Sequence, residues 1–221
     1  MKKWMVQTLA VVCLLTFAAS AWSVPIPVGT FDDNLVATTG AAPWGSLTYV
    51  AHLDTAYTGK DKNGKAVFTG SLRTVVFREE SGTLDFWYQV TGSAHRIDRI
   101  SVDNYAGYST DMYFVTDGSL LPPETLGNVG TVGFEKFTHY DADVIGANFD
   151  GGLAAQTSNW WVVRTDAKSY QDATAYLQNG AQAQAACLAP APLPGSLVLV
   201  GTGLLTMAGT FVRRLRKPFV L

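Results

Sequence analysis

The sequence predicts an all-β domain, an antiparallel β-sandwich or jelly roll, between an N-terminal signal helix and a C-terminal transmembrane helix. Three observations support this prediction. Short segments rich in β-branched and aromatic residues recur through the middle of the 221-residue chain. Gly, Asn, Asp and Pro signals separate them, and no long amphipathic helical pattern interrupts them. Both ends of the chain instead combine an apolar run with basic residues.

The N-terminus has the pattern of a secretory signal peptide. Basic residues in Met1-Lys2-Lys3 precede an uncharged run of apolar and small residues from Met5 to Ala19. The small residues Ala21 and Ser23 suit cleavage after Ser23, and cleavage after Ala21 fits nearly as well. We therefore expect residues 1–23 to be a cleaved signal peptide. An uncleaved anchor is the alternative, but the run is shorter than the ~20 residues of a spanning helix.

Residues 24–189 are predicted to form the one folded domain, because this length is sufficient for a complete core. Six of the sixteen basic residues lie outside this range, whereas all eighteen acidic residues lie inside it. Ten basic and eighteen acidic residues leave the domain with a net charge of −8. Such a surface repels a phosphate backbone, so we expect no nucleic-acid partner.

The strands are predicted in chain order from alternation and turn signals. Segments 46–57 and 65–77 flank the pair Asn63-Gly64, which suits a hairpin turn with positive φ. In 83–90 apolar residues alternate with Asp85, Trp87 and Gln89, which is typical of a half-buried strand. Further strands are expected at 97–102, 111–115, 129–137, 160–165 and 173–177.

Candidate catalytic chemistry is sparse in this sequence. It has three histidines and no motif of a serine-hydrolase elbow, a zinc protease or a phosphate loop. On an extended strand His139, Asp141 and Asp143 would share one face and form a weak candidate for a cation site, although a solvated strand edge is the simpler interpretation. We expect no catalytic residue, no metal and no cofactor. A metal-dependent hydrolase built on these three residues is the less favoured alternative.

Two further features bear on binding. Adjacent Trp160 and Trp161 must point to opposite faces of a strand, so one of them needs cover or a ligand. Trp161, Tyr105 and Tyr108 are the candidates for stacking on sugar rings, with core packing as the commoner role of such residues. A carbohydrate-binding module that engages exopolysaccharide through these aromatic residues is therefore an alternative function.

The charged run 95–100 is interpreted as surface ion pairs of small energetic weight.

The C-terminal residues 190–217 form a tail in three parts. The motif Pro192-Leu193-Pro194-Gly195 opens it, and residues 195–212 follow without a charge. As a helix these 18 residues would extend roughly 27 Å, about the thickness of the hydrocarbon layer. The tail then continues with the basic residues Arg213, Arg214, Arg216 and Lys217. Basic residues favour the cytoplasmic side, so the folded domain is predicted to lie on the exported side.

This tail resembles the PEP-CTERM sorting signal of Gram-negative bacteria, with Pro192-Leu193-Pro194 in place of Pro-Glu-Pro. Segments of the domain such as "LDFWYQV" and "WWVVRTDAKSY" also look like the body of exported proteins of this family. The resemblance implies recognition by an exosortase, a membrane-embedded cysteine peptidase, and removal of the tail. It also implies delivery to the envelope surface or the medium, often beside exopolysaccharide and biofilm genes. A plain C-terminal membrane anchor is the alternative.

The sequence as a whole predicts a non-enzymatic protein of the cell envelope or extracellular matrix. It would pass through a precursor that is tethered to the inner membrane by residues 195–212. Cys13 leaves with the signal peptide, so Cys187 is predicted to be a single linker thiol ahead of the tail. Pairing of Cys187 with another chain is the alternative for this residue.

Overall fold

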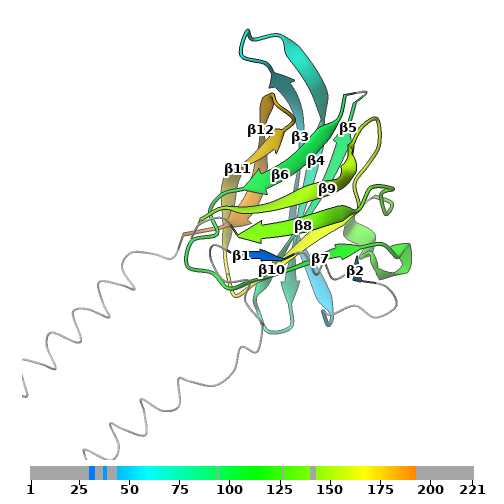
Figure 1. Cartoon of the computed structure of the whole chain (residues 1–221). Helices are drawn as coiled ribbons and strands as arrows, with labels where there is room; N and C mark the ends of the chain where they lie inside the picture. Colours follow the sequence, from blue (N-terminus) through cyan, green and yellow to red (C-terminus); the bar gives the residue numbers. More distant parts are fainter. Residues whose placement is uncertain are drawn as a thin grey trace, which may run out of the picture.

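The computed structural model describes residues 30–32, 37–38, 44–93, 95–125, 127–139 and 143–192 (Figure 1). The predicted signal peptide and the tail from residue 193 onward, with both expected flanking helices, lie outside these residues. Among the described residues the only helical elements are the 3-10 turns η1 (Gly118–Leu120) and η2 (Pro123–Thr125). Neither has the length and apolar character that a membrane crossing requires.

Twelve strands make up the fold of the described residues. They are β1 (Thr30–Asp32), β2 (Ala37–Thr38), β3 (Leu47–Lys60), β4 (Ala66–Glu79), β5 (Leu84–Gly92), β6 (Ile97–Val102), β7 (Thr110–Val115), β8 (Phe134–His139), β9 (Ile145–Leu153), β10 (Trp160–Thr165), β11 (Tyr170–Gln178) and β12 (Gln182–Pro190). Strands β6 and β10 coincide with the predicted segments. The other predicted strands are present with shifted ends.

All twelve strands belong to one sheet, in the order β1-β8-β9-β6-β11-β12-β3-β4-β5-β10-β7-β2. The ten strands from β3 to β12 are antiparallel to their neighbours, and they curl until the sheet is nearly closed into a barrel (Figure 1). At its two ends, β1 pairs antiparallel with β8 and β2 pairs parallel with β7. The all-β, antiparallel prediction is confirmed. The opposite walls face each other across a core as in a sandwich, but they are parts of one continuous sheet.

The hairpin of β3 and β4 is turned as predicted, with Gly64 at φ +79°. The Asp61 carboxylate accepts hydrogen bonds from the backbone N–H groups of Asn63 and Lys65, at 2.8 and 2.9 Å. Farther along the hairpin, aromatic rings cover glycines on the opposite strand. Phe68 lies against Gly59 and Tyr57 against Gly70, and in each case a Cβ atom on the glycine would collide with the ring. These pairs protect backbone that a glycine would otherwise leave open to water.

The sheet buries side chains on both of its faces in the region of β5. Phe86, Tyr88 and Val90 belong to the large cluster inside the curled sheet. Trp87 belongs to a second cluster on the outer face, with Trp44, Val75, Phe77, Val115, Trp160 and Val162. Leu120 and Leu121, at the end of η1, pack against this outer cluster. The prediction of a half-buried strand at 83–90 is therefore wrong, because the chain around Trp44 and η1 covers its second face.

Strand β12 was not predicted, and it is an interior strand of the sheet. It pairs with β11 along its whole length, from Gln182 opposite Gln178 to Pro190 opposite Tyr170. Its first half alternates exposed glutamine with buried alanine. Alanine has a low β propensity, so this segment does not have the composition typical of a strand. The prediction that Cys187 is a linker thiol is wrong, since the residue is fully buried in β12.

Candidate functional site

The three aromatic residues predicted to contact sugar rings lie in the interior. Trp161 and Tyr105 are 0% exposed and Tyr108 is 8% exposed. The Trp161 ring stacks on Phe137, with centroids 6.1 Å apart. The prediction of a glycan contact at these residues is wrong, because their ring faces are occupied or enclosed by the core. Trp160 does point to the other face, where Trp87 lies beside it at 6.3 Å.

The predicted cation site is only partly within the described residues. His139 is buried at the end of β8, Asp143 is half-buried, and Asp141 lies outside the described residues. The Asp143 carboxylate accepts a hydrogen bond from the Ala106 backbone N–H at 3.3 Å. Within the described parts of the chain, no group of three or more His, Cys, Asp or Glu side chains is placed to hold a metal ion. Asp143 therefore has a structural contact, and the cation site stays a prediction.

Of the predicted sorting residues, only Pro192 lies within the described part of the chain, and it is exposed. Leu193, Pro194, Gly195 and the basic residues Arg213, Arg214, Arg216 and Lys217 lie outside it. Ala191, the residue before the motif, forms hydrogen bonds to the domain through its backbone N–H group and through its backbone carbonyl. Ala191 N–H donates to the Ser169 carbonyl at 3.1 Å, and the Ala191 carbonyl accepts from the Tyr108 hydroxyl. The motif therefore starts where the packed domain ends.

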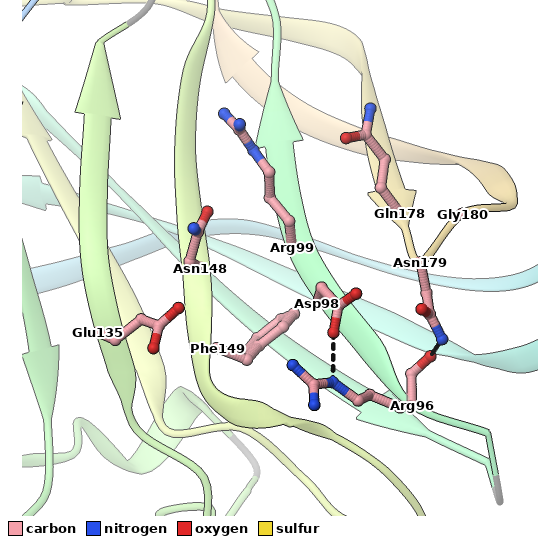
Figure 2. Close-up of a pocket in the computed structure, with 9 residues that line it drawn as sticks. All are labelled: Arg96, Asp98, Arg99, Glu135, Asn148, Phe149, Gln178, Asn179 and Gly180. Atoms are coloured by element: carbon pink, nitrogen blue, oxygen red, sulfur yellow. Dashed lines mark hydrogen bonds and ion pairs between the residues drawn. The ribbon is translucent and has the colours of Figure 1, made fainter.

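A polar pocket that the sequence did not predict lies on the outer face of the wall formed by β8, β9, β6 and β11 (Figure 2). Its volume is about 280 Å³. It is lined by Arg96, Asp98, Arg99, Glu135, Asn148, Phe149, Gln178, Asn179 and Gly180. The charged run 95–100 thus contributes to a concave site as well as to an ion pair.

The register of β9 is irregular with both of its neighbours at this pocket. On β6 the buried residues Ile97 and Ile100 have two residues between them instead of one, at a shift in the register with β9. The extra residues of this irregularity lie on β9, where residues 149–152 stand opposite the single residue Asp98, and neither Asp98 nor Arg99 is buried in the core. On β8 one extra residue lies between Phe134 and Lys136 in the register with β9, and Glu135 and Lys136 both stay out of the core.

Asn148 lies at the centre of this arrangement. It is the register partner of Arg99 on one side and of Lys136 on the other, and cross-strand partners share a face. An acidic and a basic side chain therefore flank it on each side. Its Oδ1 atom is buried and accepts no hydrogen bond from any residue that the structure describes. Buried polar atoms without a hydrogen bond are uncommon in folded proteins.

Glycines of β9 make room for the two arginines. A Cβ atom on Gly146 would collide with the guanidinium group of Arg99, and one on Gly152 would collide with the side chain of Arg96. Contacts fix Arg96 further, because its guanidinium pairs with Asp98 and its backbone carbonyl accepts from the Asn179 amide (Figure 2). The Arg99 guanidinium donates to the Thr138 hydroxyl at 3.1 Å. Both arginines of the pocket therefore have contacts within the domain.

A second hollowed region crosses the outer face of β4 and β5. Two adjoining hollows of about 370 and 460 Å³ share Gln89 and Thr91. The polar groups there are bonded to each other. Gln89 Nε2 donates to the carbonyls of Asn128 and Ser158, and the hydroxyls of Thr91 and Thr157 are 3.1 Å apart. This region is therefore a weaker candidate for a ligand than the pocket at Asn148.

Carboxyl groups gather around Arg164 on the outer face of β5, β10 and β7. Arg164 pairs with Glu79, and its Nε atom lies 4.0 Å from Oδ1 of the fully buried Asp85. Burial raises the pKa of Asp85 well above its usual value, Glu79 raises it further, and Arg164 opposes both. Burial also raises the pKa of Asp111, the register partner of Arg164 on β7. This cluster is an electrostatic feature of the sheet wall.

Comparisons with protein-family models, with curated proteins and with solved structures give no match.

Proposed function

We propose that this chain is a non-enzymatic protein of the bacterial cell envelope or extracellular matrix that is sorted through its C-terminal tail. Residues 1–23 direct export, and residues 195–212 hold the precursor in the inner membrane as a helix. An exosortase-like peptidase then recognises Pro192-Leu193-Pro194 and removes the tail. The product reaches the envelope surface or the medium.

The observation that carries this proposal is the position of the motif relative to β12. Pairing of β12 with β11 needs every residue from Gln182 to Pro190. The next residue, Ala191, is bonded through both of its backbone groups, and Pro192 is exposed. Cleavage after Pro192 would therefore leave the sheet complete, whereas cleavage a few residues earlier would remove part of an interior strand.

Several buried hydroxyl groups that the structure describes bond to backbone groups of the fold. The Ser158 hydroxyl accepts from the Val90 backbone N–H at 3.0 Å and donates to the Asn159 carbonyl at 2.8 Å. The Thr165 hydroxyl donates to the Leu84 carbonyl at 2.7 Å. These side chains satisfy backbone groups in the interior, as folded proteins require.

Fractionation of cells that produce tail variants tests the proposal. We expect the wild-type protein in the surface or medium fraction. The double substitution Pro192→Ala/Pro194→Ala should retain it in the inner membrane. Pro123→Ala, at an exposed proline of η2, is the matched control and should behave as the wild type. An unchanged distribution of the double variant would refute recognition of the motif, and retention of the wild type in the inner membrane would favour a plain anchor.

A further inference from the structure

We propose that the pocket around Asn148 binds a neutral sugar unit of a polysaccharide. The inference concerns the outer face of the domain and does not depend on how the tail is processed. It rests on the chemistry of the side chains that line the pocket.

The lining offers donors and acceptors in nearly equal measure. The carboxylates of Asp98 and Glu135 accept, the guanidinium groups of Arg96 and Arg99 donate, and the amides of Asn148, Gln178 and Asn179 do both. Each of these groups is planar and presents two polar atoms side by side. Neighbouring hydroxyls of a sugar ring match such pairs, because a hydroxyl also donates and accepts.

Charge favours a neutral ligand over an anionic one. The four charged side chains that line the pocket comprise two arginines, one aspartate and one glutamate, so their charges cancel. Arg96 is already paired with Asp98. The whole domain has a net charge of −8, which repels polyanions. A uronic-acid or phosphate polymer would thus meet an unfavourable field and no uncompensated cation in the lining.

The size and position of the pocket suit one unit of a longer chain. About 280 Å³ is close to the lower end of the ~300–1,000 Å³ that small-molecule sites occupy. The Arg96 and Asp98 side chains at its rim are 58% and 45% exposed. The rim is therefore open to solvent, and a polymer can continue beyond the bound unit.

Affinity electrophoresis tests this inference with the full chain purified in a mild nonionic detergent. Native gels contain dextran, mannan or galactan as neutral probes and alginate as the anionic probe. The variants are Asn148→Ala, Glu135→Gln and Gln178→Ala. Gln182→Ala is the matched control, because Gln182 is the register partner of Gln178 on the same hairpin and does not line the pocket. Thermal unfolding confirms that each variant is folded.

We expect at least one neutral polysaccharide to retard the wild type, with alginate causing no more retardation than a gel without polymer. Loss of one hydrogen bond should weaken binding about fivefold in Gln178→Ala, whereas Gln182→Ala should bind as the wild type does. Absence of retardation by all three neutral probes overturns the inference. So does equal retardation of the wild type and the three pocket variants, or stronger retardation by alginate. Sorting of the tail is read out separately by fractionation, so failure of either proposal leaves the other intact.

Discussion

The Tyr88 hydroxyl donates a hydrogen bond of 2.7 Å to the backbone carbonyl of Leu188, a residue one hundred positions later in the chain. Strand β12 has only one register pair with β3, between Gln182 and Lys60, so most of that side of β12 has no strand partner in the ladder. A side chain from β5 thus satisfies a carbonyl of the last strand. The Tyr105 hydroxyl lies 2.7 Å from that of Tyr88 and must be the donor between them, since Tyr88 has one proton.

Tyr88→Phe is expected to lower the free energy of unfolding by about 1–3 kcal/mol, because it leaves the Leu188 carbonyl buried without its donor. Tyr105→Phe should cost less, since the bond from Tyr88 to Leu188 remains. Urea unfolding measures both changes. Tyr170→Phe is the control, because Tyr170 is 39% exposed. A larger loss in Tyr105→Phe than in Tyr88→Phe would contradict the assigned direction of the bonds.

Trp160→Ala should lower the free energy of unfolding by about 3–5 kcal/mol, as much as Trp161→Ala. Both rings are 0% exposed, although they lie on opposite faces of β10. Chemical unfolding monitored by circular dichroism gives the comparison. If Trp160→Ala cost less than ~0.5 kcal/mol, the outer cluster would be a surface patch and not a second core.

Asp85→Asn is expected to stabilise the protein at neutral pH. Burial and Glu79 raise the pKa of folded Asp85 above its unfolded value, so the folded state holds the proton more tightly. The stability of the wild type therefore falls as pH rises from the unfolded pKa, about 3.9, toward the folded pKa. Asp85→Asn should lack the part of this decline in the free energy of unfolding that Asp85 causes. Unfolding titrations at a series of pH values measure the difference, and identical profiles would refute a raised pKa.

Asp54→Asn provides the control of opposite sign. A hydrogen bond from Arg73 is the main cause that lowers the pKa of Asp54. The ionised Asp54 carboxylate therefore adds to the free energy of unfolding above its unfolded pKa, and this stabilisation is lost as pH falls. The Asp54 side chain is 49% exposed, so the loss at neutral pH should be small. A stabilising effect of Asp54→Asn at neutral pH would count against this electrostatic account.

Cys187 should resist a maleimide reagent in the folded mature protein and react once the chain is unfolded in urea. The residue is 0% exposed, and burial raises the pKa of its thiol, which disfavours the reactive thiolate. Mass spectrometry counts the added groups in each state. A disulfide-linked dimer on a nonreducing gel would contradict this burial and support the alternative that Cys187 pairs with another chain.

The sequence predicted elements where local pattern and fold agree. Strands at 97–102 and 160–165 have β-branched or aromatic residues in their segments and occur at the predicted positions. Strand β12 escaped prediction because alanine and glutamine fill it. The outer cluster escaped it because the cover of Trp87 comes from Trp44 and η1, which are distant in the sequence.

The pocket could not be predicted for a related reason. A bulge is a shift between two strands, and it becomes visible only when both partners are known. Asp98 and Arg99 look like surface charges until β9 places Asn148 beside them. The signal that was present, a charged run within a strand at 95–100, indicates polarity but not concavity.

The most direct test of the proposed sorting is the intact mass of the protein recovered from the surface and medium fractions of its native cells. We predict a chain without residues 1–23 whose C-terminus lies between Pro192 and Gly195, immediately after the last residue bonded to the domain. A recovered chain that still ends at Leu221 and stays in the inner membrane would contradict the proposal and make the tail a permanent anchor.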